Sequence, residues 1–129
     1  MSRASLTDEI VERLRQRPDG TLLSTWSVHD DAWSDLSVRD FHQLVVGIAK
    51  GLIAQGILPG DRVVLRSRTR HEWTLVDYAI WWAGAVTVPL YETSAAEHTA
   101  WVVADAGAKL AVVESDDNSL DLPTWTIEA

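Results

Sequence analysis

From Ser37 onward the apolar residues recur at helical spacing. A period near 3.6 predicts a helix that buries one face, formed by Val38, Phe41, Leu44, Val45, Ile48, Leu52 and Ile53. Ser37 with Asp40 three residues later resembles a capping box at the start of this helix. Gly56 is predicted to end it in the left-handed conformation.

Helix, glycine and strand then alternate along the chain. The turn "LPGD" leads to the strand "RVVLRS". Two further rounds follow: a helix at about 71–83, Gly84 and the strand "AVTVPL", then a helix at 95–106, Gly107 and the strand "KLAVVE", with Ser94 and Glu97 as a capping box. The strands are near-continuous apolar runs, as in a sheet covered on both faces. This alternation predicts an α/β fold with right-handed crossovers and a mostly parallel sheet.

The two ends of the chain depart from this alternation. Residues 5–17 read as a helix whose apolar face is Leu6, Ile10, Val11 and Leu14. Residues 21–28 and 32–35 read as a hairpin around the turn "HDDA". Near the other end, "TWTI" reads as a strand with no covering helix after it, which predicts an incomplete sheet. Pro89 has no N–H to donate, so it is expected at a strand end or sheet edge.

Composition limits the class of protein. Hydrophobic residues make up 47% and charged residues 23% of 129 residues, as in a packed domain. The formal net charge of −8 disfavours nucleic acid and polybasic membrane contact. No cysteine is present, which excludes disulfides and cysteine-based sites. The longest uncharged run, 78–91, is shorter than the about 20 residues of a membrane span, and no signal peptide is visible. We therefore expect a cytoplasmic protein without a transmembrane segment, with peripheral membrane association as an alternative.

The seven tryptophans are many for this length. A buried tryptophan covers roughly 150–250 Å². Some of these side chains are therefore expected to pack against something that this chain does not contain.

Metal and phosphate motifs are absent from the sequence. The four histidines are scattered, without the i, i+4 spacing of ligands: His29, His42, His71 and His98. "HEWTL" begins like a metalloprotease helix, but Leu75 stands where the second histidine belongs. "GILPG" has no following Lys-Ser/Thr, and no nucleophile elbow occurs.

Three positions remain candidates for chemistry. "RSRTR" at 66–70 follows a strand, where α/β folds bind ligands, although a solvated loop paired with acids is the favoured reading. The hydroxyls of "YETS" at 91–94 have a similar place, with helix capping by Ser94 as the alternative. Asp77 lies inside an apolar helix, either as a buried functional acid or, more often in such helices, facing solvent or paired with an arginine.

Longer segments carry a family resemblance. "GLIAQGILPGDRVVL", "HEWTLVDYAIWWAGAVTVPLYETS" and "DAGAKLAVVE" resemble the N-terminal part of adenylate-forming acyl-CoA synthetases, and "VPLYETS" points to long-chain fatty acid–CoA ligases. The resemblance extends over roughly 18–127. It implies that 1–129 is a partial N-terminal domain, with a leading helix at 1–17, a strand pair at 18–36 and a βαβ-type lobe at 37–129.

The resemblance also implies a chemistry. Such enzymes join a fatty acid to ATP as an acyl-adenylate and pass the acyl group to CoA, assisted by Mg²⁺. The family's Pro-Lys-Gly loop, its adenine- and ribose-binding motifs and its catalytic lysine match no residue here. Lys50 and Lys109 lie in a helix and before a strand, and fit none of these roles. We therefore assign no catalytic, cofactor-binding or metal-binding residue and expect no cofactor to bind this segment.

The family resemblance implies that this segment has a partner, the rest of the synthetase domain. The segment is expected to be inactive alone, as a truncated, split or excised part of a ligase whose remaining domain lies on the same or a neighbouring chain. The alternative is a free-standing small α/β module that binds a ligand or regulates a complete ligase.

Overall fold

The computed structural model describes residues 5–27, 29–68, 70–91, 93–114, 120 and 122–127. Along the chain its elements are α1 (Leu6–Gln16), β1 (Thr21–Ser27), β2 (Ala32–Ser37), α2 (Val38–Ala54), β3 (Arg62–Arg66), α3 (His71–Trp82), β4 (Val86–Leu90), α4 (Ala96–Ala106), β5 (Leu110–Val113) and β6 (Thr124–Thr126). The predicted helices and strands are therefore present, with ends shifted by a few residues.

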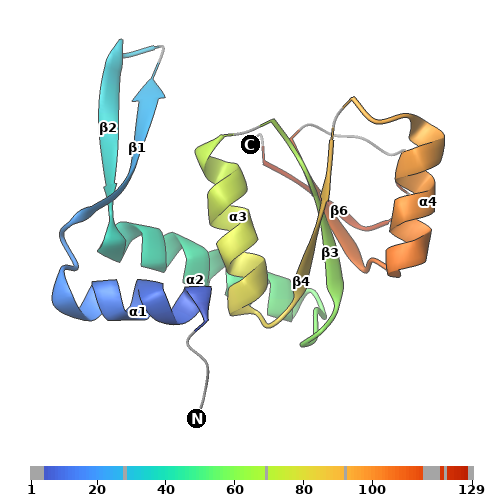
Figure 1. The fold of residues 1–129 in the computed structure, drawn as a ribbon, viewed down its shortest axis with the longest axis horizontal. Coiled ribbons are helices and arrows are strands. Elements are labelled where there is room, and N and C mark those ends of the chain that lie inside the picture. Colours follow the sequence, from blue (N-terminus) through green and yellow to red (C-terminus); the bar gives the residue numbers. More distant parts are fainter. Residues whose placement is uncertain are drawn as a thin grey trace.

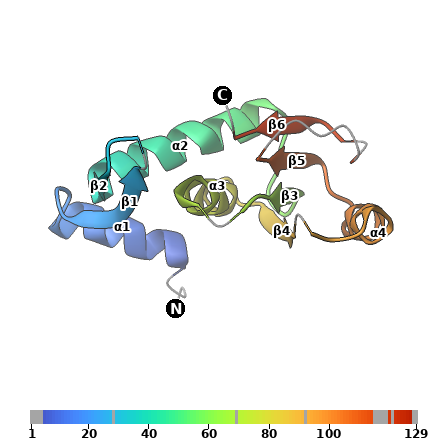
Figure 2. The ribbon, with the colours of Figure 1, turned by 90° about the horizontal axis from the view of Figure 1, so that it is seen from above.

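A four-stranded parallel sheet forms the centre of the molecule. Its strand order is β4-β3-β5-β6, and all three neighbouring pairs are parallel. Helices α2 and α3 lie on one side of this sheet and α4 lies on the other (Figure 2). The predicted α/β fold with a mostly parallel sheet is confirmed. Strand β4 lies at an edge, as Pro89 indicated, and so does β6.

The N-terminal hairpin projects from the helices α1 and α2 (Figure 1). Strands β1 and β2 are antiparallel, with Trp26 opposite Trp33. These two rings meet edge to face with centroids 5.4 Å apart, and they remain 47% and 68% exposed. The predicted hairpin is confirmed, apart from Val28, which lies outside the described residues. Trp101 is also 63% exposed, so three tryptophans lack a covering surface among the described residues.

Two predicted apolar faces are wider than the buried ones. On α2 the structure buries Val38, Phe41, Val45, Ala49 and Leu52. Leu44 and Ile53 stay 47% and 56% exposed, because the sheet and α3 cover a narrower arc than the apolar residues span. On α1, Ile10 is buried and Leu14 half-buried, but Val11 is 39% exposed. The side chain of Leu6 lies outside the described part.

The helix ends follow local sequence with one exception. Ser5 and Asp8 form a full capping box on α1, and the Ser37 hydroxyl accepts the N–H of Asp40 at 3.1 Å on α2. The predicted capping box on α4 is wrong. Its N-cap is Ala95, which makes no side-chain hydrogen bond, because the helix begins one residue later than a cap at Ser94 requires.

The predicted glycine stops are confirmed. Gly56, Gly84 and Gly107 have φ of 100°, 80° and 63°. Gly107 is the C-cap of α4 in the left-handed region, where a side chain would be strained.

Candidate functional site

The candidate site lies where the carboxyl ends of β3 and β5 meet. The strand that follows β3 in the chain, β4, and the strand that follows β5, β6, lie at opposite edges of the sheet. Neighbouring strands with diverging connections form a topological switch point, the usual ligand position in open α/β sheets. The residues after β3 and the first residue after β5, Glu114, occupy this point.

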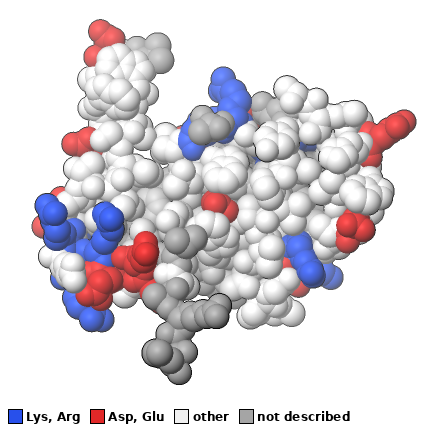
Figure 3. All heavy atoms as spheres, viewed as in Figure 1, with Lys and Arg blue, Asp and Glu red and all other residues white. Residues whose placement is uncertain are grey.

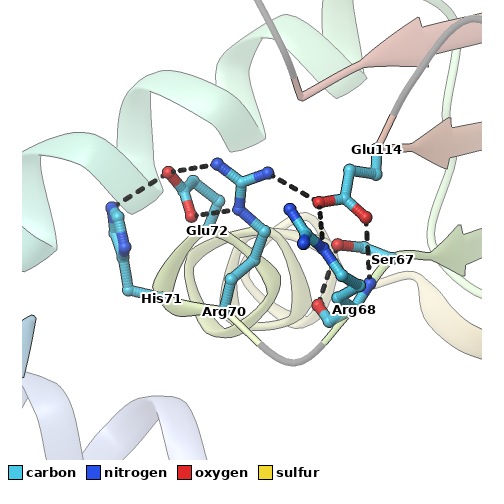
Figure 4. A network of polar contacts seen from close by, with 6 residues as sticks. All are labelled: Ser67, Arg68, Arg70, His71, Glu72 and Glu114. Carbon is cyan, nitrogen blue, oxygen red and sulfur yellow. Dashed lines mark hydrogen bonds and ion pairs between the residues drawn. The ribbon is translucent and has the colours of Figure 1, made fainter. Parts of the chain in front are cut away.

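Glu114 is the centre of an ion-pair network (Figure 4). Its side chain is only 5% exposed. Its carboxylate accepts hydrogen bonds from Arg68 Nε at 2.8 Å and from Arg70 Nη1 at 2.9 Å. It also accepts the backbone N–H of Arg68 at 3.3 Å. Glu114 therefore ties the loop after β3 to the end of β5.

Arg70 extends the network to the first turn of α3. It donates from Nε to Glu72 at 2.7 Å and from Nη2 at 3.1 Å, a bidentate pair. His71 Nε2 lies 3.1 Å from the same carboxylate. The hydrogen bond to Glu72 raises the pKa of Arg70, burial opposes this rise, and Glu114 adds to it. Burial by itself would raise the pKa of Glu72, but the Arg70 hydrogen bond and the nearby cations hold it below its ordinary value.

This geometry decides between the two readings of "RSRTR". Arg68 and Arg70 are held by acids of this chain, as the favoured reading predicted, although Thr69 lies outside the described residues. An external anion would have to displace Glu114 or Glu72. The network therefore works as a clamp at the switch point.

Sequence reasoning missed both glutamates. Glu72 stands in the first helical turn, and Glu114 comes directly after a buried strand. One sequence feature could have pointed to Glu114: it follows the carboxyl end of β5, and "RSRTR" stands at the carboxyl end of β3. It required knowing that β3 and β5 are neighbours.

Asp77 on α3 is buried, with 8% of its surface exposed. Burial raises the pKa of its carboxyl, and the Thr87 hydroxyl on β4 opposes this shift only in part. The Thr87 oxygen is itself buried and makes no hydrogen bond of standard geometry to a described residue. The prediction that Asp77 faces solvent is therefore wrong, and no ion pair joins it to an arginine in the described part of the chain.

The other candidates are dispersed. Tyr91 is 79% exposed, and Glu92 of the "YETS" segment lies outside the described residues. His42 packs on Trp82 and His98 stacks on Trp101, with ring centroids 5.2 Å and 6.4 Å apart. Within the described ranges, no group of three His, Cys, Asp or Glu side chains is arranged to hold a metal ion. Lys50 and Lys109 are exposed on α2 and before β5.

A groove of about 370 Å³ adjoins the clamp and shares Glu72 with it. Its lining is mostly apolar and comes from α2, α3, β5 and β6. On the side of the molecule seen in Figure 3, charged side chains gather at the end formed by α1, while the centre carries few. None of the helices described here is long and apolar enough to cross a membrane.

Comparison with known proteins assigns the family. The model of the AMP-binding enzyme family matches residues 10–127. The chain therefore belongs to the AMP-binding enzymes. The long-chain-fatty-acid–CoA ligase FadD15 of Mycobacterium tuberculosis is 39% identical over 110 residues, which are 85% of this chain and 18% of that protein. The chain thus spans about a fifth of the length of this relative, and it resembles the N-terminal part of such ligases.

Solved structures share the fold. The Legionella pneumophila fatty acyl-adenylate ligase, solved with acyl adenylate and pyrophosphate, matches 97% of this chain and 23% of its own, with a TM-score of 0.82 and 21% identity. The N-terminal subdomain of Klebsiella oxytoca NpsA matches 94% of this chain and 29% of its own, with a TM-score of 0.77 and 20% identity. The resemblance to adenylate-forming enzymes drawn from sequence is confirmed.

Proposed function

We propose that this chain is the N-terminal part of a long-chain fatty acid–CoA ligase. The observation that carries the proposal is the 39% identity over 110 residues with FadD15. The complete enzyme would activate a fatty acid with ATP and Mg²⁺ to an acyl-adenylate and then form the CoA thioester in the cytoplasm. In that reaction the described residues act as scaffold. At the switch point, Arg68 and Arg70 are paired with the chain's own carboxylates, Glu114 and Glu72.

The partner in this proposal is the remaining synthetase domain, on the same or a neighbouring chain. The division at residues 17 and 36 into leading helix, strand pair and lobe stays a prediction. A free-standing anion-binding module is less well supported, because Arg68 and Arg70 are already paired with Glu114 and Glu72.

A chimera tests the function. The matched segment of FadD15 is replaced by this chain, and palmitoyl-CoA formation is measured with and without ATP, CoA and Mg²⁺. We expect activity that depends on all three, whereas FadD15 with the segment deleted stays inactive. A folded chimera without activity would contradict the proposal. This chain alone is expected to show no ATP–pyrophosphate exchange with palmitate.

A further inference from the structure

The hairpin of β1 and β2 has one face that packs on the molecule and one that does not. Leu23 and Leu36 are cross-strand partners, and both pack against the larger buried cluster. Successive strand residues point to opposite faces. Trp26 and Trp33 are also cross-strand partners, three residues further from each of these leucines, so they share the opposite face. This second face of the projecting hairpin therefore carries two exposed tryptophans (Figure 1).

An acid lies beside the tryptophans on the same face. Asp35 follows Trp33 by two residues on β2, and its cross-strand partner is Ser24 on β1. The Ser24 hydroxyl donates to Asp35 Oδ1 at 2.7 Å, which orients an exposed carboxylate. Residues two apart on a strand are separated by roughly 6.5 Å. One ligand group can therefore reach both the carboxylate and the neighbouring ring.

The two rings form a corner that is open to solvent. Their centroids are 5.4 Å apart and their planes meet at 66°, so the edge of one ring lies on the face of the other. Exposed fractions of 47% for Trp26 and 68% for Trp33 leave surface of both rings free. The face of an aromatic ring carries negative potential and attracts cations, most strongly in tryptophan. The corner is therefore suited to an organic cation.

The charge of the hairpin favours the same kind of ligand. Residues 21–38 contain three aspartates and no lysine or arginine, in a chain of net charge −8. Asp31 in the turn and Asp35 are both exposed. A fatty acid or an anionic lipid surface would be repelled here. An uncharged apolar partner would have to remove water from these carboxylates without pairing them.

We propose that the face formed by Trp26, Trp33 and Asp35 binds an arginine side chain in a basic segment of another protein. A guanidinium group is planar, so it can stack on an indole ring while its edge donates two hydrogen bonds to a carboxylate. Trp33, the more exposed ring, carries the stack, and Asp35 accepts the hydrogen bonds. A lysine ammonium has no flat face to stack and fits less well. A second copy of this chain would bring two bodies of net charge −8 together.

A fluorescein-labelled peptide of alternating glycine and arginine tests this binding by fluorescence anisotropy with the 129-residue chain. We expect saturable binding. Trp33→Ala and Asp35→Asn should each raise the Kd by about fivefold or more, because each removes one of the two contacts with the guanidinium group. A peptide with citrulline in place of arginine keeps the shape but loses the charge, and should bind at least as weakly as it does to these variants.

Two substitutions on α4 are matched controls. Trp101→Ala removes a tryptophan that is 63% exposed, close to the exposure of Trp33, and Glu97→Gln removes an exposed negative charge. Neither should change the Kd of the arginine peptide. Trp33→Phe keeps a ring that attracts cations less strongly, so its Kd should lie between those of the parent and Trp33→Ala. Circular dichroism like that of the parent shows that each variant is folded.

Four results would overturn the proposal. They are absence of binding to the parent chain, equal binding of the citrulline peptide, equal weakening by the α4 controls, and sedimentation showing that the tryptophan face pairs two copies of this chain. The equal weakening would mean that the peptide responds only to exposed rings or to net charge. Because the assay contains no ATP, CoA or fatty acid, its failure is separate from failure of the chimera.

Discussion

The two faces of the parallel sheet are covered to different extents. On the α2 and α3 side, Val63, Leu65 and Val112 join a cluster that reaches from Ile10 on α1 to Ala85 before β4. On the α4 side, Val64 and Val113 belong to a cluster of six described buried residues. Successive strand residues point to opposite faces, so the same strands serve both clusters. The N-terminal helices therefore pack against only one face of the sheet, the face that α2 and α3 cover.

Matched leucine deletions test this difference with the largest expected effect. Leu52→Ala removes a fully buried side chain from the larger cluster and should cost about 4 kcal/mol, whereas Leu90→Ala on the edge strand should cost about 2 kcal/mol. Urea unfolding followed by circular dichroism measures both. Equal losses would show that the two faces are equally important to stability.

Removal of the Glu114 side chain tests the clamp at the carboxyl ends of β3 and β5. Glu114→Ala takes away the hydrogen bonds from Arg68 and Arg70, and should cost about 2 kcal/mol, since bonds to charged groups contribute roughly 1.5–3 kcal/mol and Arg68 is mostly exposed. Glu97→Ala, on an exposed position of α4, should change stability by less than about 0.5 kcal/mol. Chemical denaturation that fails to separate the two variants argues against the clamp.

Two glycines, Gly47 inside α2 and Gly107 at the C-cap of α4, should respond to substitution with opposite signs. Gly107→Ala at the end of α4 places a side chain at φ 63° and should destabilise by about 1 kcal/mol. Gly47→Ala inside α2 meets open space and should stabilise by about 0.5–1 kcal/mol. Thermal unfolding at constant pH gives both signs. A stabilised Gly107→Ala variant would mean that α4 ends differently from the structure.

Two acids on α3 should give the smallest and most pH-dependent effects. Because burial raises the pKa of Asp77, its contribution to stability is present at low pH and lost as pH rises through that pKa. Asp77→Asn should therefore stabilise the protein at neutral pH and lose this advantage in acid. Glu72 has a lowered pKa, so its contribution to stability is fully present above its unfolded-state pKa and is lost as pH falls through its folded-state pKa. Glu72→Gln should therefore destabilise the protein at neutral pH and progressively less in acid. The free energy of unfolding of both variants, measured from pH 3 to 8, checks both predictions. If the two variants showed the same dependence on pH, the opposite pKa shifts of Asp77 and Glu72 would be contradicted.

Local sequence determined most of the fold. Apolar runs separated by helix and glycine predicted β3, β4 and β5 with their parallel arrangement, because period and turn chemistry are properties of neighbouring residues. The same reasoning failed at Ser94, where one residue decides whether a hydroxyl can reach a helix N-terminus. It also failed at Leu44 and Ile53, whose exposure depends on the width of the surface that α3 and the sheet provide.

The sequence by itself determined the alternation of helix and strand, the charge and the family resemblance, since each depends on residues close together in the chain. Only the tertiary structure decided that Glu114 meets Arg68 and Arg70, that Asp77 is buried, and that Trp125 lies on Gly51. These contacts join residues from different strands and helices. Their distances depend on the order of strands in the sheet, which no local pattern specifies.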